Sequence, residues 1–252
     1  CDYAQDIICA YKEIIKKFSK LGAEWIQFDE PALVTDLTGE DIELFEKLYK
    51  DILSDKGGLK VLLQTYFGDI RDCYENVCAL DFDGIGLDFL EGKQTQELVK
   101  KYGFPENKTL FAGLVNGKNI WKCDYDKTLS ALEEIKRYAA NIVLSTSCSL
   151  LHVPYTLKNE NNLQDEVKQH FSFALEKLQE LQELSVLTEC ADYKEQKEYI
   201  QNRSVFEQER LYQDDEVKQN VAQLSEKDFV RLPKRAERQK LQKSVFKLPV
   251  LP

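Results

Sequence analysis

Two adjacent carboxylates, Asp29 and Glu30, are the first candidates for chemistry in this sequence. They follow the apolar residues Trp25, Ile26 and Phe28. Pro31 ends the predicted strand because proline cannot donate to a β ladder. At the end of a strand such acids could bind an amine or act as a general base. They could equally cap the next turn or pair with a basic residue. The pattern predicts a strand with both acids at its carboxyl end, where parallel α/β folds bind ligands.

Residues 145–152, Ser-Thr-Ser-Cys-Ser-Leu-Leu-His, hold the largest group of reactive side chains. Cys148 and His152 lie four residues apart, so they could be a nucleophile with its base or two zinc ligands. A catalytic zinc usually takes three protein ligands. The only other histidine, His170, is expected to pack within a helix. We therefore favour a structural role for Cys148 and His152.

Other polar residues follow other apolar segments. Gln64, Thr65 and Tyr66 end one segment and Asp88 ends another, but neither set has the character of a metal site by itself. Residues 116–119, Asn-Gly-Lys-Asn, are typical of a turn. We favour a turn here over a ligand-binding loop.

Alternating helical and extended patterns predict the elements that position these residues. Thr38, with Asp41 three residues later, resembles a capping box at the start of one helix. The predicted strands cover residues 24–30, 59–66, 84–90, 109–115 and 141–147. The predicted helices cover residues 4–21, 38–56, 71–80, 94–102, 124–140 and 165–184.

These elements make five βα units at intervals of about 30 residues, typical of a βαβ repeat. They predict an α/β fold, a partial (β/α)8 TIM-type barrel with a helical C-terminal extension. An open doubly wound sheet is the alternative, although no GxGxxG or GxxxxGK[ST] motif supports nucleotide binding. Residues 1–187 are expected to form the barrel part and residues 188–252 a charged helical segment that ends in an extended linker, 246–252.

Composition excludes several classes of function. The net charge is −10, which disfavours nucleic acid as a partner. No apolar run approaches the roughly 18 residues of a transmembrane helix, so no membrane partner is expected. Seven cysteines at irregular spacing favour free thiols and a cytoplasmic location. Because methionine is absent and the sequence opens on a helical pattern, we expect a piece of a longer protein.

The C-terminal tail is basic. A solvated helix face is the favoured interpretation, and attraction of a polyanionic ligand is the alternative. One acid, Glu237, lies among seven basic residues: Arg231, Lys234, Arg235, Arg238, Lys240, Lys243 and Lys247.

Four motifs, at residues 23–33, 63–68, 112–121 and 147–154, together resemble the cobalamin-independent methionine synthase family. The resemblance is close over residues 20–160 and looser in the tail. It implies a protein with two barrels, of which this chain resembles the later part of the N-terminal one. Residues 188–252 would then lead toward the absent C-terminal catalytic barrel.

The resemblance implies transfer of the N5-methyl group of 5-methyltetrahydropteroyltriglutamate to homocysteine, with zinc held by the catalytic barrel. No catalytic residue, metal or cofactor is expected in this chain, which would be mainly scaffold and part of the wall of the folate cleft. Cys148 and Asp88 resemble vestigial counterparts of zinc ligands. The expected substrate-binding residues are Asp29, Glu30, Asn116, Ser147 and His152.

Two alternatives remain open: a non-enzymatic, barrel-derived binding module, and a single-barrel methyltransferase relative with its own site at Asp29, Asp88 and Cys148. Five barrel strands leave two open sheet edges, with unpaired backbone N–H and C=O groups. We therefore expect the chain by itself to self-associate or aggregate.

Overall fold

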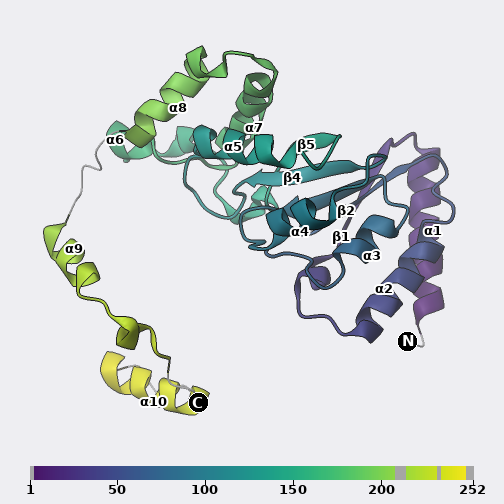
Figure 1. Ribbon diagram of the computed structural model, residues 1–252, viewed down its shortest axis with the longest axis horizontal. Helices are drawn as coiled ribbons and strands as arrows, with labels where there is room; N and C mark the ends of the chain where they lie inside the picture. The colour runs from purple at the N-terminus through teal and green to yellow at the C-terminus, as the bar shows by residue number, and fades with distance from the viewer. Residues whose placement is uncertain (1–2, 208–213, 232–233, 248–252) are drawn as a thin grey trace. The chain divides into compact units, whose positions relative to one another are not determined.

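Five parallel strands form one sheet and follow each other across it in chain order, as the computed structural model shows (Figure 1). It describes residues 3–207, 214–231 and 234–247. The order never reverses, whereas a doubly wound sheet reverses at its switch point. The arrangement therefore confirms the predicted α/β fold, with five βα units of a partial barrel. The strands are β1 (Trp25–Asp29), β2 (Lys60–Gln64), β3 (Gly84–Asp88), β4 (Thr109–Val115) and β5 (Ile142–Thr146).

Helices precede β1 and follow each strand. The predicted capping box is confirmed at the start of the second helix, where Thr38 N–H donates to Asp41 Oδ2 at 2.9 Å and Asp41 N–H to Thr38 Oγ1 at 3.3 Å. The helices of this part are α1 (Ala4–Lys20), α2 (Gly39–Ile52), α3 (Tyr74–Ala79), α4 (Thr95–Tyr102), α5 (Tyr125–Ile135), α6 (Asp165–Lys168), α7 (Ala174–Glu189) and α8 (Lys197–Glu207).

The core lies around the three central strands. β3 is buried along its whole length, whereas the outer strands β1 and β5 contain no buried residue. Alternation along β1 places Phe28 on the helix-covered face, where its ring lies 5.0 Å from that of Tyr11 on α1. Asp29 therefore points to the opposite face.

The prediction of one continuous helix over residues 165–184 is wrong. The structure has two helices, α6 and α7, and His170 lies between them rather than within a helix. In this gap the backbone pairs with distant segments: Lys122 N–H donates to His170 C=O and Ser172 N–H to Ile120 C=O. These tertiary hydrogen bonds replace the helical ones.

The chain divides into two compact units, Cys1–Glu207 and Gln208–Pro252. Within the first, Tyr199 of α8 donates to Asp126 of α5 at 2.7 Å. The second contains α9 (Asp215–Ala222) and α10 (Arg235–Phe246), and none of its described residues is buried. The linker predicted over 246–252 lies mostly outside the described residues. The domain boundary predicted at residue 187 stays a prediction. No helix in the described part of the chain is long and apolar enough to cross a membrane.

Candidate functional site

The polar residues that the sequence places at strand ends lie together at the carboxyl-terminal end of the sheet. Asp29 pairs with Gln64 between β1 and β2, and Asp88 pairs with Gly113 between β3 and β4. Val115 pairs with Thr146 at the end of β4 and β5. The carboxyl ends of all five strands therefore meet in one region, as expected for a ligand-binding edge.

Asp29 and Glu30 are adjacent but have different surroundings. Asp29 is exposed and accepts a hydrogen bond of 2.6 Å from Gln27 Nε2. Glu30 is half-buried and accepts a hydrogen bond from the hydroxyl of Tyr49 on α2. Burial raises the pKa of Glu30, and the hydrogen bond from Tyr49 opposes this rise. Glu30 thus joins β1 to α2, whereas Asp29 remains accessible.

Asp88, at the end of β3, is almost completely buried and binds backbone on two loops. Its Oδ1 accepts the N–H of Leu90 and of Glu91, at 2.8 and 2.9 Å. Its Oδ2 accepts the N–H of Phe67 at 3.0 Å. Burial raises the pKa of Asp88, and these three backbone hydrogen bonds oppose this rise. The side chain joins the loop after β2 to the loop after β3.

Asn116 and Ser147 shape the loop after β4. Asn116 Oδ1 accepts the N–H groups of Lys118 and Asn119, both at 2.9 Å, so the expected turn is present. The buried Ser147 Oγ accepts Gly117 N–H at 3.2 Å. Both side chains thus hold the backbone in place.

Cys148 and His152 do not act on each other. The thiol of Cys148 is buried and donates to the carbonyl of Ser149 at 3.7 Å, and burial raises its pKa. The exposed His152 ring packs instead on Phe67, with 5.3 Å between ring centroids. No hydrogen bond between the two side chains occurs among the described residues, so a nucleophile–base pair has no geometric support.

These residues do not fit a zinc site. Both oxygens of Asp88 already accept backbone N–H groups, and the ring of His152 lies against Phe67. Within the described ranges, no three His, Cys, Asp or Glu side chains come together as a metal-binding group. A closed tetrahedral site needs four such ligands, so we derive no chemistry through zinc in this chain.

Side chains from the loops at the carboxyl ends of the strands form an aromatic and charged cluster that we call the Phe67 surface: Tyr66, Phe67, Glu91, Lys118 and His152. The rings of Tyr66 and Phe67 lie 5.0 Å apart, nearly perpendicular. Lys118 Nζ lies 5.2 Å from the centroid of Phe67 and 2.6 Å from Glu91 Oε1. Loops after four different strands thus meet around one ring.

The backbone of Phe67 is unusual. Its φ of 68° lies in the left-handed region, which few residues other than glycine adopt. The hydrogen bond from its N–H to Asp88 holds this conformation, and 39% of the residue is exposed. Such conformations cluster at ligand sites. Sequence reasoning missed Phe67, Glu91 and Lys118 as site residues, because nothing in their types marks a left-handed phenylalanine or a contact between loops.

Comparisons with known proteins identify similar sequences. A family model described as "Cobalamin-independent synthase, N-terminal domain" matches residues 1–140. The 5-methyltetrahydropteroyltriglutamate–homocysteine methyltransferase of Lactococcus lactis subsp. lactis is 49% identical over 251 residues, which are 98% of this chain and 32% of that protein. The corresponding protein of Streptococcus thermophilus is also 49% identical, over 100% of this chain and 33% of its own length. The chain thus spans about a third of the length of these curated relatives.

One solved structure is similar as well. It is a B12-independent methionine synthase from Shewanella sp. W3-18-1, with 13% sequence identity and a TM-score of 0.48 over 71% of this chain and 52% of that chain.

Proposed function

The chain belongs to the cobalamin-independent synthase family through the N-terminal domain of that family, and from this membership we propose that it is a segment of a methyltransferase. The complete protein would transfer the N5-methyl group of 5-methyltetrahydrofolate polyglutamate to homocysteine and so make methionine. Zinc and the methyl-transfer chemistry would lie in its catalytic barrel. The six described cysteines are free thiols, which supports a cytoplasmic location.

Within that protein, we assign this segment a scaffold role. The single observation that carries this assignment is the use of Asp88, whose carboxylate is occupied by three backbone N–H groups from two loops. Glu30, Asn116 and Ser147 also bind neighbouring structure. Side chains engaged in this way hold loops in position and are poorly placed to exchange protons with a substrate.

The Phe67 surface is the part of the scaffold that would form the folate-cleft wall. It lies at the carboxyl ends of the strands, where barrels bind ligands. Exposed aromatic rings suit a flat heterocycle, because stacked or edge-to-face rings gain about 0.5–1.5 kcal/mol beyond area burial. Of the residues predicted to bind substrate, His152 belongs to this surface and Asp29 is accessible at the same edge. Glu30, Asn116 and Ser147 would contribute only indirectly.

The test is steady-state kinetics of the complete protein that contains this chain. We expect Phe67→Ala to raise KM for the methylfolate by about three- to tenfold, the equivalent of one aromatic contact. KM for homocysteine and the zinc content should not change. Phe206→Ala is the matched control, since Phe206 on α8 is also 39% exposed and lies outside the Phe67 surface.

Two results would contradict the proposal. Unchanged methylfolate KM in both Phe67→Ala and His152→Ala would remove the cleft-wall role. Methionine formation by the 252-residue chain alone, from methylfolate and homocysteine, would remove the scaffold role and favour a single-barrel enzyme with its own site.

A further inference from the structure

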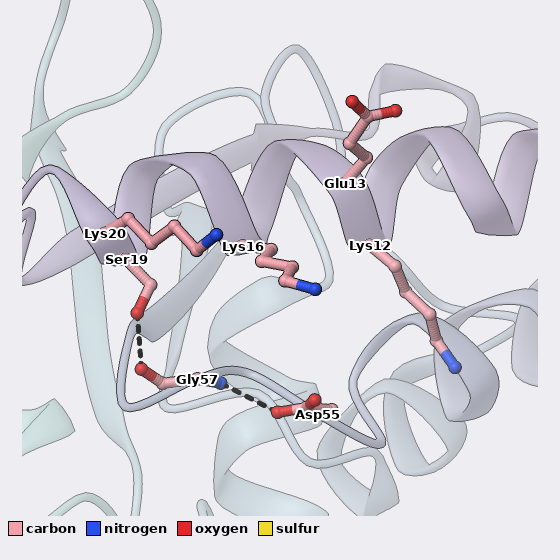
Figure 2. A pocket seen from close by; sticks show the side chains of 7 residues that line it. All are labelled: Lys12, Glu13, Lys16, Ser19, Lys20, Asp55 and Gly57. Carbon is pink, nitrogen blue, oxygen red and sulfur yellow. Dashed lines mark hydrogen bonds between the residues drawn. The ribbon is translucent and has the colours of Figure 1, made fainter.

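A groove at the opposite end of the sheet carries a row of lysines. It has a volume of about 560 Å³ and lies between α1 and the loop that leads from α2 into β2 (Figure 2). Because this loop precedes β2, the groove belongs to the amino ends of the strands, away from the Phe67 surface. Its lining residues are Lys12, Glu13, Lys16, Ser19, Lys20, Asp55 and Gly57.

Three of these residues form a regular array of positive charge. Lys12, Lys16 and Lys20 follow each other at four-residue steps, which places them on one face of α1 about 6 Å apart along the axis. None of the three forms an ion pair within residues 3–207, 214–231 and 234–247. In a chain of net charge −10, three neighbouring ammonium groups without acidic partners are a local exception.

The acids of the groove have other partners. Glu13 pairs with Lys17 at 2.8 Å, and its side chain points away from the loop in Figure 2. Asp55 Oδ1 accepts Gly57 N–H at 3.1 Å within its own loop. Within the described residues, neither carboxylate forms an ion pair with Lys12, Lys16 or Lys20.

The loop that faces the lysines is fixed. Ser19 Oγ on α1 donates to the carbonyl of Gly57. Gly57 and Gly58 have φ values of 56° and 86°, which other residues rarely adopt, so this turn depends on both glycines. A fixed loop opposite a row of lysines makes a groove of defined width.

We propose that the lysine groove binds an oligophosphate chain, inorganic or esterified. Lysine ammonium groups act as point charges that suit phosphate oxygens, whereas planar carboxylates are matched best by the arginine fork, and the groove contains no arginine. Several phosphates in line can satisfy several lysines along the helix. The site is independent of the proposed methyltransferase function, because it lies at the other end of the strands.

The experiment is isothermal titration of the 252-residue chain with sodium tripolyphosphate, at a protein concentration where size-exclusion chromatography gives one species. We expect one saturable site. The triple variant K12Q/K16Q/K20Q should lose at least about tenfold in affinity for tripolyphosphate, because each lysine removed takes away charge-assisted hydrogen bonds. K100Q is the control, because Lys100 is an exposed lysine on α4 that does not line the groove, and this variant should bind as the unsubstituted chain does.

Three outcomes would overturn the proposal: equal affinity in the triple variant, an equal loss in K100Q, or a heat signal reproduced by sodium chloride at matched ionic strength. A parallel titration with a nucleoside triphosphate distinguishes the sources. If the nucleoside triphosphate binds more tightly than tripolyphosphate and the triple variant loses this binding, the ligand is an esterified oligophosphate. If the nucleoside triphosphate binds more weakly, the ligand is an inorganic one. The unfolding midpoint of each variant without ligand verifies that it is folded.

Discussion

At the scale of single residues, the surroundings of a carboxylate decide what it can do. Asp88 and Asp29 both end a strand at the same edge of the sheet. Asp88 is buried and accepts three backbone N–H groups, whereas Asp29 is exposed and bonds one glutamine side chain. Two acids at the ends of their strands thus have different roles: Asp88 holds two loops in position, and Asp29 is exposed at the surface.

Asp88→Asn tests the loop-ordering role. The amide keeps the shape but presents an NH₂ group to at least one backbone N–H, which then loses its acceptor in a buried site. We expect the free energy of unfolding to fall by about 1.5–3 kcal/mol in urea denaturation, the range for hydrogen bonds to charged groups. Asp29→Asn should change it by less than about 0.5 kcal/mol, as for most surface substitutions. Equal effects of the two variants would refute the distinction.

A second buried carboxylate lies on α7. Glu180 Oε1 accepts Cys123 N–H at 3.0 Å, but Glu180 Oε2 and Ser172 Oγ have no hydrogen-bond partner in the described structure. Burial raises the pKa of Glu180 and lowers that of Lys177, one helical turn earlier. Both charged forms are therefore disfavoured in this part of the fold.

The raised pKa of Glu180 predicts how stability depends on pH. Above its ordinary value of 4.5, the unfolded chain releases the proton before the folded chain does. The contribution of Glu180 to stability is thus full below that value and is lost as pH rises through the folded-state pKa. Glu180→Gln keeps an acceptor for Cys123 and carries no charge. We expect stability to decline less steeply with rising pH than in the unsubstituted chain.

Thermal unfolding across pH, monitored by circular dichroism, measures this effect. Glu189→Gln, an exposed change on the same helix, should leave the profile unaltered. A Glu180→Gln profile as steep as that of the unsubstituted chain would show that the buried carboxylate does not govern the pH dependence.

At the scale of elements, the loops after β4 and β5 approach each other closely. A Cβ on Gly117 would lie 2.3 Å from the carbonyl oxygen of Cys148. We expect Gly117→Ala to lower the free energy of unfolding by about 1–3 kcal/mol, as overpacking does. Gly39→Ala is the matched control, because nothing lies within 4 Å of its Cβ position at the start of α2. Gly39→Ala should raise the free energy of unfolding by up to about 1 kcal/mol, measured by chemical denaturation. Comparable losses in both variants would contradict the steric explanation.

Elements whose determinants are local could be predicted from the sequence. The five strands, α1 and the capping box of α2 follow from periodicity and from residues a few positions apart. The break between α6 and α7 could not, because it depends on backbone partners about 50 residues away, Ile120 and Lys122. The Phe67 surface depends in the same way on contacts among four loops. The sequence thus predicted that the site lies at the carboxyl ends of the strands. It did not predict which side chains contact each other there.

At the scale of the whole molecule, the sheet has two free edges. Within the described residues, β1 pairs only with β2 and β5 only with β4, although a closed barrel would give each strand two neighbours. β5 also exposes Val143, which is 41% accessible. Unpaired strand edges with exposed apolar residues are templates for pairing with another chain.

The open edges predict that the 252-residue chain self-associates through its sheet. By size-exclusion chromatography with light scattering, we expect a mass above that of a monomer at concentrations on the order of 10 μM, where exposed edges begin to aggregate. Val143→Lys should shift the chain toward monomer, because a charged residue on an edge strand opposes pairing. Val217→Lys places the same change on α9, outside the sheet, and should not. A monomeric chain with one cooperative unfolding transition would mean that the two edges are satisfied within a single molecule, and that the partial barrel needs no further strands to be stable.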